Sequence, residues 1–160
     1  MREIDENGLR LCNMQAKIFA GTLKELQCGS AVFIRRFMFS FFAERMDDDS
    51  FLYETSNEQD AYREIEQEYG STNYGSEKYS YDELYWMGYL YRYWCYVYQT
   101  ESKKVYRIIS PRELRKLYFP YHSLDTKNAI ERILEAKGIE EEDKIEKGVK
   151  ILRRIKNCKR

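Results

Sequence analysis

His122 is the single histidine of the chain, and a carboxylate close to it in the sequence suggests proton-transfer chemistry. Asp125 follows three residues later, so the two side chains could in principle form an oriented general base. The sequence places no nucleophile beside them, and Asp125 is also a good residue to begin a helix. Structural or capping use of both side chains is therefore favoured. An enzyme centred on His122 is kept only as a third alternative, and we expect no catalytic activity.

Metal chemistry has little support. Asp47, Asp48 and Asp49 could offer hard oxygens to Mg²⁺, but consecutive side chains point in different directions and acidic turns are common. The cysteines are scattered along the chain: Cys12, Cys28, Cys95 and Cys158. They do not have zinc-motif spacing, and they lie within helical patterns, which favours free, buried thiols in a reducing compartment. We expect no metal ion and no cofactor.

Tyrosine is the unusual residue of this chain, with 15 Tyr beside 8 Phe and 2 Trp. The densest aromatic stretch is residues 79–98. At about 100° per residue, one arc of a helix there carries Tyr85, Tyr89, Arg92 and Tyr96, with Gly88 beside them. Tyr and Arg are enriched in binding hot spots, and Gly lets another chain approach. We predict that these residues bind a partner protein. The alternatives are packing against the chain's own helices and stacking on single-stranded bases.

Charge is balanced overall, with 27 basic and 27 acidic residues, and so gives no indication of general affinity for nucleic acid or anionic membranes. Locally, residues 44–68 hold ten acidic residues against two basic ones. The reverse block contains Lys103, Lys104, Arg107, Arg112, Arg115 and Lys116. Solvated helix faces are the default interpretation of both blocks. The runner-up function is a small helical DNA-binding regulator that uses the basic block.

Helical periodicity and capping residues dominate the chain, and no convincing alternating strand pattern occurs. Helices are predicted at about residues 5–26, 31–46, 57–69, 81–99, 102–109, 111–118, 126–137 and 140–157. Three predicted capping boxes begin at Ser56, Ser80 and Ser110. We predict an all-α fold, a compact bundle of about six to seven helices around the aromatic-rich helix. One domain is expected over residues 1–160, ending in an amphipathic helix with a basic tail over 140–160.

The longest apolar run, residues 31–43, is interrupted by Arg35 and Arg36 and is shorter than the about 20 residues that a membrane-spanning helix needs. The N-terminal residues are too acidic and polar for a targeting peptide. We therefore expect a cytoplasmic protein with no membrane segment. Association of two or more copies is left open, since an apolar helix can also lie beneath an interface between subunits.

Three segments of the sequence together form one pattern: YWMGYLYRYW over residues 85–94, YHSLD over 121–125 and AIER over 129–132. The pattern resembles that of small bacterial all-α proteins found in toxin–antitoxin-like or phage-defence gene clusters, and the resemblance spans about residues 33–135. It implies only an accessory, interaction-type role, since the family carries no catalytic assignment that could be transferred to this chain. Together with the aromatic arc, it leads us to predict an interaction protein that neutralises or regulates a toxin-like partner by covering its active surface.

Overall fold

The computed structural model describes residues 1–139, and these residues form eight α-helices, one 3-10 turn and no strand. The predicted all-α class is therefore confirmed. The predicted helix over 140–157 lies outside the described residues. The chain divides into two compact units, Met1–Ser123 and Leu124–Arg160. None of the helices in residues 1–139 combines the length and the apolar character needed to cross a membrane.

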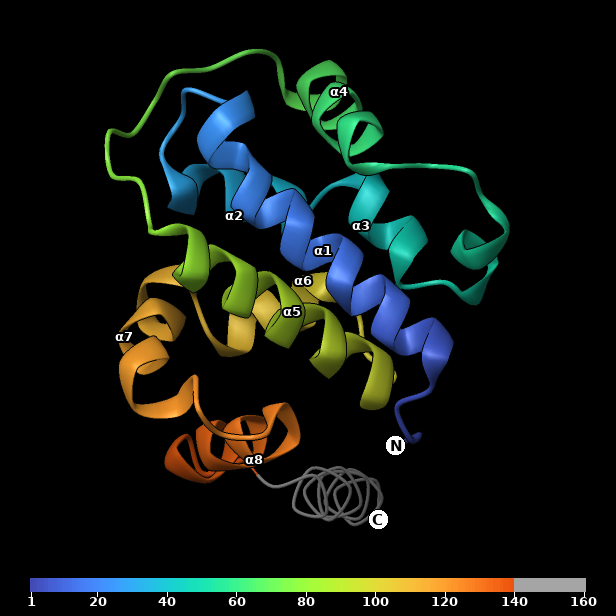
Figure 1. Ribbon diagram of the computed structural model, residues 1–160, viewed down its shortest axis with the longest axis vertical. Helices are drawn as coiled ribbons and strands as arrows, with labels where there is room; N and C mark the ends of the chain where they lie inside the picture. The colour runs from blue at the N-terminus through green and yellow to red at the C-terminus, as the bar shows by residue number, and fades with distance from the viewer. Residues whose placement is uncertain (140–160) are drawn as a thin grey trace, which may run out of the picture. The chain divides into compact units, whose positions relative to one another are not determined.

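Two antiparallel helices form the centre of the first unit, α1 (Glu6–Glu25) and α5 (Tyr81–Val97), which lie side by side in Figure 1. Gly88 permits their close approach, because a Cβ at this position would lie only 2.7 Å from the Gln15 carbonyl oxygen. α5 begins with the predicted capping box, in which Ser80 accepts from the Glu83 N–H and Glu83 accepts from the Ser80 N–H. The aromatic-rich helix is thus central, as predicted.

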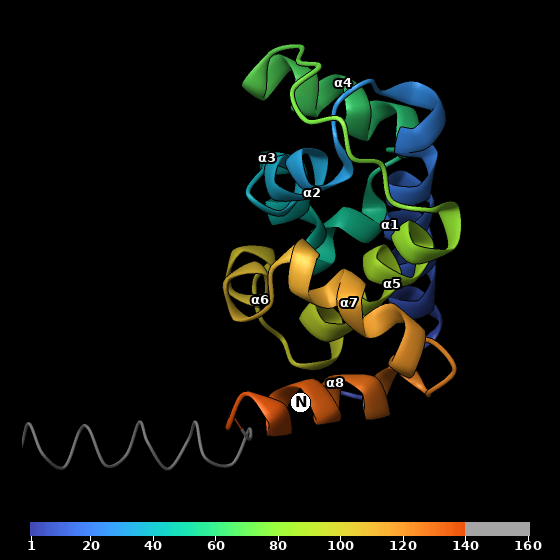
Figure 2. The same ribbon diagram turned by 90° about the vertical axis from the view of Figure 1, so that its left-hand side faces the viewer.

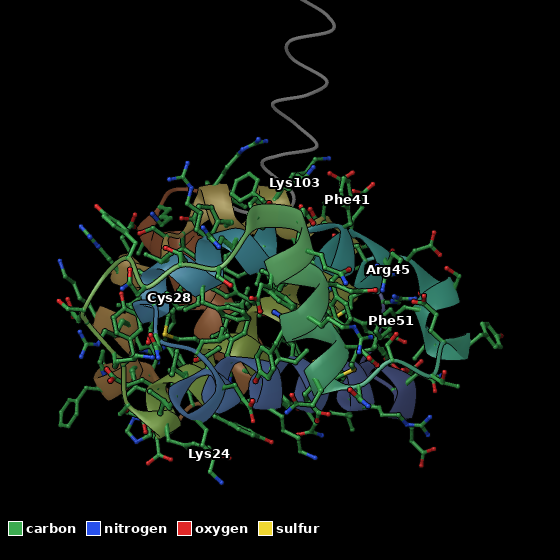
Figure 3. The ribbon with its side chains drawn as sticks, turned by 90° about the horizontal axis from the view of Figure 1, so that it is seen from above. Lys24, Cys28, Phe41, Arg45, Phe51 and Lys103 are labelled. Carbon is green, nitrogen blue, oxygen red and sulfur yellow. The ribbon has the colours of Figure 1, made fainter. Side chains whose placement is uncertain are left out.

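The apolar stretch after α1 forms two helices rather than the single helix predicted over 31–46. α2 spans Ser30–Met38 and α3 spans Phe41–Met46. The break occurs at Ser40, whose hydroxyl accepts from the Ala43 N–H at 3.1 Å and so starts α3. A short 3-10 turn, η1 (Asp49–Tyr53), follows. In Figure 3, Phe41 lies at the rim of the unit, where it is 66% exposed, whereas Phe51 lies inside.

Helix α4 (Glu58–Tyr69) starts one residue later than the predicted capping box at Ser56 implied. Asn57 is the N-cap, since its side chain accepts from the Asp60 N–H and Asp60 accepts in return from the Asn57 N–H. An Asn–Asp pair therefore serves where a Ser–Gln pair was predicted.

The chain after α5 continues with α6 (Ser102–Ile108) and α7 (Pro111–Tyr121). Ser110 caps α7 as predicted, accepting from the Glu113 N–H at 3.3 Å. The helix was predicted to end near residue 118, but Pro120 lies inside its last turn. The turn is closed beyond the proline by the His122 N–H, which donates to the Tyr118 carbonyl oxygen at 2.8 Å. In the second unit, α8 (Thr126–Ala136) buries its own apolar stripe around Ile130 and Ile133.

Aromatic rings fill the core of the first unit. Phe19 of α1 meets the ring of Phe37 edge-on at 5.2 Å and also contacts Phe33 and Tyr91. Figures 1 and 2 show α2, α3 and α4 on the α1 side of the central pair and α6 and α7 on the α5 side. Both sides of α5 are thereby covered over much of its length, which decides where its tyrosines and arginine lie.

Candidate functional site

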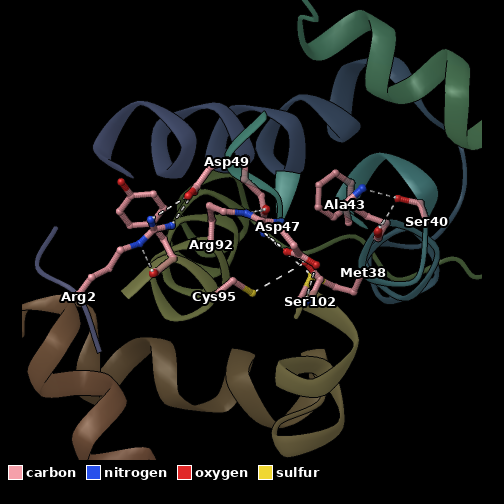
Figure 4. Close-up of polar contacts among 12 residues, drawn as sticks. Arg2, Met38, Ser40, Ala43, Asp47, Asp49, Arg92, Cys95 and Ser102 are labelled. Carbon is pink, nitrogen blue, oxygen red and sulfur yellow. Dashed lines mark hydrogen bonds and ion pairs between the residues drawn. The ribbon is translucent and has the colours of Figure 1, made fainter. Parts of the chain in front are cut away.

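Arg92 does not lie on a free surface, because its guanidinium group is enclosed at the centre of the first unit and the residue is 1% exposed. Its Nε donates to Gln15 Oε1 at 2.7 Å and its Nη1 donates to Asp47 Oδ1 at 2.6 Å. Its Nη2 donates to Ser102 Oγ at 3.0 Å. Figure 4 shows the contacts of Arg92 with Asp47 and Ser102. A buried charge needs such partners, and here they come from α1, the end of α3 and the start of α6.

Gly88 and Tyr96 are buried as well. Gly88 faces the backbone of α1, and Tyr96 donates its hydroxyl proton to Asp5 Oδ1 at 2.6 Å. The Arg2 guanidinium covers the Tyr96 ring at 3.6 Å from its centroid. The hydroxyl of Tyr96, together with the Gly8 N–H, holds the pKa of Asp5 below its usual value. The expectation that Gly88, Arg92 and Tyr96 form an exposed face is therefore wrong, since the chain's own N-terminal segment and α1 cover them.

Asp47 holds Arg92 and the start of α6 at the same time. Its Oδ2 accepts from the Ser102 N–H at 2.9 Å, and its Oδ1 accepts from the Ser102 hydroxyl at 2.7 Å. The Asp47 carboxylate thus accepts hydrogen bonds from Ser102, the first residue of α6, and also neutralises the buried Arg92 guanidinium. The acidic triplet is split by this arrangement: Asp48 caps η1 and Asp49 pairs with Arg2. Within residues 1–139, no three His, Cys, Asp or Glu side chains gather closely enough to hold a metal ion.

Tyr85 and Tyr89, the other two residues of the predicted face, are partly exposed and line a groove between α5 and α7. The groove has a volume of about 420 Å³ and is open to solvent. Five aromatic rings line it: Tyr81, Tyr85, Trp86, Tyr89 and Tyr118. Asp82 and His122 complete its lining. We call this feature the aromatic groove.

Polar and ring contacts hold the aromatic groove in shape. Tyr118 meets Trp86 edge-on at 5.7 Å and stacks on His122 at 4.5 Å. The Nδ1 of His122 carries the proton, because it donates to the Tyr118 carbonyl oxygen at 2.8 Å. Tyr85 donates its hydroxyl proton to Asn13 Oδ1 at 3.0 Å, which ties the ring to α1. His122 thus serves as a structural element of the groove wall.

The six residues of the predicted basic block lie in three different environments. Arg115 is not free, since its Nε pairs with Glu83 at 3.0 Å and its Nη1 pairs with Glu77, which fastens α7 to the start of α5. Lys103 is half-buried, at an acidic hollow that includes Asp48 and Asp49. The other four side chains are exposed and form no ion pair within residues 1–139: Lys104, Arg107, Arg112 and Lys116.

Three of the four cysteines lie in the described residues, and all three are free and buried, as predicted. Cys158 lies outside that range. Burial raises the pKa of both Cys12 and Cys95 to about 12. Their nucleophilic thiolate form is therefore scarce near neutral pH.

Iodoacetamide at about pH 8 is expected to leave Cys12, Cys28 and Cys95 unmodified in the folded protein and to alkylate all three in guanidinium. The physical reason is the exclusion of reagent from buried sulfur, reinforced at Cys12 and Cys95 by the scarcity of thiolate. Peptide mass spectrometry measures each site separately. Rapid alkylation of Cys95 in the folded protein would contradict its buried position.

Sequence reasoning missed three rings of the aromatic groove. It gave no binding role to Tyr81, Trp86 or Tyr118. The missing signal was the pairing of α5 with the end of α7, which is not visible in the periodicity of either helix.

Comparisons of the chain with protein-family models, with curated proteins and with solved structures found no match.

Proposed function

We propose that this chain is a cytoplasmic interaction protein that binds a partner protein in the aromatic groove and regulates it. The single observation that supports this proposal is the gathering of five aromatic rings at a solvent-open hollow between α5 and α7. Exposed aromatic clusters are typical of binding hot spots because each ring offers a large, rigid contact area. The prediction of a partner-binding surface on α5 is thus retained, with Tyr85 and Tyr89, while its centre moves toward α7.

The lining of the aromatic groove also indicates the chemistry of the partner. It contains the exposed carboxylate of Asp82 and no Lys or Arg. Ring faces attract cations, and they bury aliphatic chains. A partner segment with a protruding Lys, Arg or aliphatic side chain fits this combination. A toxin whose active surface carries such residues is the candidate partner, and neutralisation would follow from covering that surface.

The double variant Tyr85→Ala/Tyr118→Ala is expected to weaken partner binding at least about 30-fold, which corresponds to a hot-spot loss of about 2 kcal/mol. Tagged wild-type chain first captures the partner from cells that express both proteins at native levels. Isothermal titration with the purified partner then compares the variants. Circular dichroism must show unchanged helix content in the double variant.

Tyr53→Ala is the matched control, since Tyr53 is 90% exposed on η1, a different element from the groove. It should bind the partner like the wild type. Equal binding by wild type and by Tyr85→Ala/Tyr118→Ala would overturn the proposal, and so would equal losses in the double variant and in Tyr53→Ala.

A further inference from the structure

A second surface of the first unit combines arginines with partly exposed rings, on the α2, α6 and α7 side of the fold. Figure 2 shows α2 and α6 on the same side of this unit. The cations of this surface are Arg35, Arg36, Arg107 and Arg112. The rings are Phe39, Tyr69, Tyr74 and Tyr106. We call this set the basic–aromatic strip.

One half of the basic–aromatic strip surrounds a hollow of about 390 Å³. Its lining consists of Val32, Arg35, Arg36, Phe39, Tyr69 and Tyr74. Arg36 is held in place, because its Nη1 donates to the Gly70 carbonyl oxygen at 2.7 Å and its guanidinium lies 5.5 Å from the Tyr69 ring. The hollow therefore presents ring faces and guanidinium groups together, with no carboxylate in its lining.

The other half continues from Phe39 onto α6. The Tyr106 ring meets the Phe39 ring edge-on at 5.1 Å, and the Arg107 guanidinium lies 5.6 Å from the same ring. Burial raises the pKa of Tyr106, while the cations of Arg35 and Arg112 act to lower it. Two neighbouring hollows share Val32 and Tyr74, and the second of them includes Arg112. The two halves are thus continuous.

The cations of this strip differ from most arginines elsewhere in the unit, the exposed Arg10 of α1 being the exception that likewise forms no ion pair within residues 1–139. Arg2, Arg45, Arg63, Arg92 and Arg115 each pair with a carboxylate. In contrast, Arg35, Arg107 and Arg112 form no ion pair with any residue from 1 to 139. A carboxylate does act on Tyr69, that of Glu68, which together with burial raises the pKa of the ring hydroxyl and also accepts from the Phe41 N–H at 2.9 Å. The positive potential of the strip is therefore available to an external anion.

We infer that the basic–aromatic strip binds single-stranded nucleic acid, with phosphates on the arginines and bases stacked on the rings. Proteins that hold single strands combine a positively charged track with aromatic platforms, and guanidinium groups match phosphate geometry. An acidic peptide would use the arginines but would have no need of four accessible rings. A rigid duplex hides its base faces, so the rings would gain nothing from it. This surface is distinct from the aromatic groove and does not depend on the function proposed there.

The test uses fluorescence anisotropy with a fluorescein-labelled oligothymidylate of about 12 nucleotides, within the site sizes typical of single-strand binders. The wild-type chain should bind it at low salt, and affinity should fall as salt rises, with a logarithmic slope of about −0.7 for each phosphate contact. Arg35→Ala/Arg107→Ala should weaken binding at least about tenfold and reduce that slope. Tyr74→Ala should weaken binding about tenfold, as expected for one lost base stack.

Two controls match these variants. Arg10→Ala/Lys17→Ala removes the same charge from exposed positions on α1, and Tyr53→Ala removes a ring that is 90% exposed on η1. Both should bind like the wild type. Absence of wild-type binding at low salt would overturn the inference, as would affinities that do not change in Arg35→Ala/Arg107→Ala. Equal binding of a duplex of the same length, or full competition by polyglutamate, would also overturn it.

Discussion

Replacing Arg92 by alanine is expected to lower the free energy of unfolding by about 3–5 kcal/mol, because a mostly buried carboxylate loses its ion-pair partner. Asp47 would remain at the core with a side chain only 12% exposed. Gln15 and Ser102 would also each lose a hydrogen bond. At about 2–4 °C for each kcal/mol, the melting temperature should fall by about 6–20 °C. Urea unfolding followed by tryptophan fluorescence measures the change, since both tryptophans lie on α5.

Arg10→Ala provides the control, since Arg10 is exposed on α1 and its replacement should change stability by less than about 0.5 kcal/mol. Arg92→Lys separates charge from geometry. A lysine keeps the charge but cannot reproduce the fork of donors that reaches Gln15, Asp47 and Ser102, so it should restore only part of the loss. Wild-type stability in Arg92→Ala would mean that this buried network contributes nothing to the fold.

Replacing Gly88 by alanine is the second substitution with a large expected effect, and its sign is the informative part. Elsewhere in a helix this change stabilises by about 1 kcal/mol. Here the added Cβ would lie 2.7 Å from the Gln15 carbonyl oxygen and 2.9 Å from the Ala16 Cα, both of which are backbone atoms. The two helices must move apart, at a cost of about 1–3 kcal/mol. We therefore expect net destabilisation in urea unfolding, and a larger loss for Gly88→Leu.

Gln67→Ala on α4 is the reference substitution, because it places an alanine at an exposed helical position where no neighbouring helix has to shift. It should leave stability within about 0.5 kcal/mol of the wild type. An increase in stability for Gly88→Ala would show that α1 and α5 are not in close contact at this residue.

The all-α fold and the central place of α5 could be predicted from the sequence because both depend on local signals. Capping residues such as Ser80 and Ser110 act within one turn, and helical periodicity needs only neighbouring residues. The break at Ser40 was missed because the apolar pattern continues on both sides of it, with Phe39 before it and Phe41 and Phe42 after it. Apolar spacing alone does not reveal that Phe41 points outward.

The burial of Arg92 could not be predicted in the same way. Helical periodicity separates two sides of α5, but it does not say what covers each side. The partners of Arg92 are 77, 45 and 10 positions away in the sequence, in Gln15, Asp47 and Ser102. No local pattern links them. For the same reason only Tyr85 and Tyr89 of the aromatic groove were predicted. Tyr118 comes close to Trp86 only because α7 packs against α5.

Site-specific photo-crosslinking in cells tests the proposed function most directly. A photoreactive p-benzoylphenylalanine in place of Tyr85 or of Tyr118 reports which protein lies within reach of the aromatic groove. We predict one and the same crosslinked partner from both positions, and no crosslink when the probe replaces Tyr53 on η1. A partner that crosslinks from position 53 while positions 85 and 118 stay silent would contradict the account.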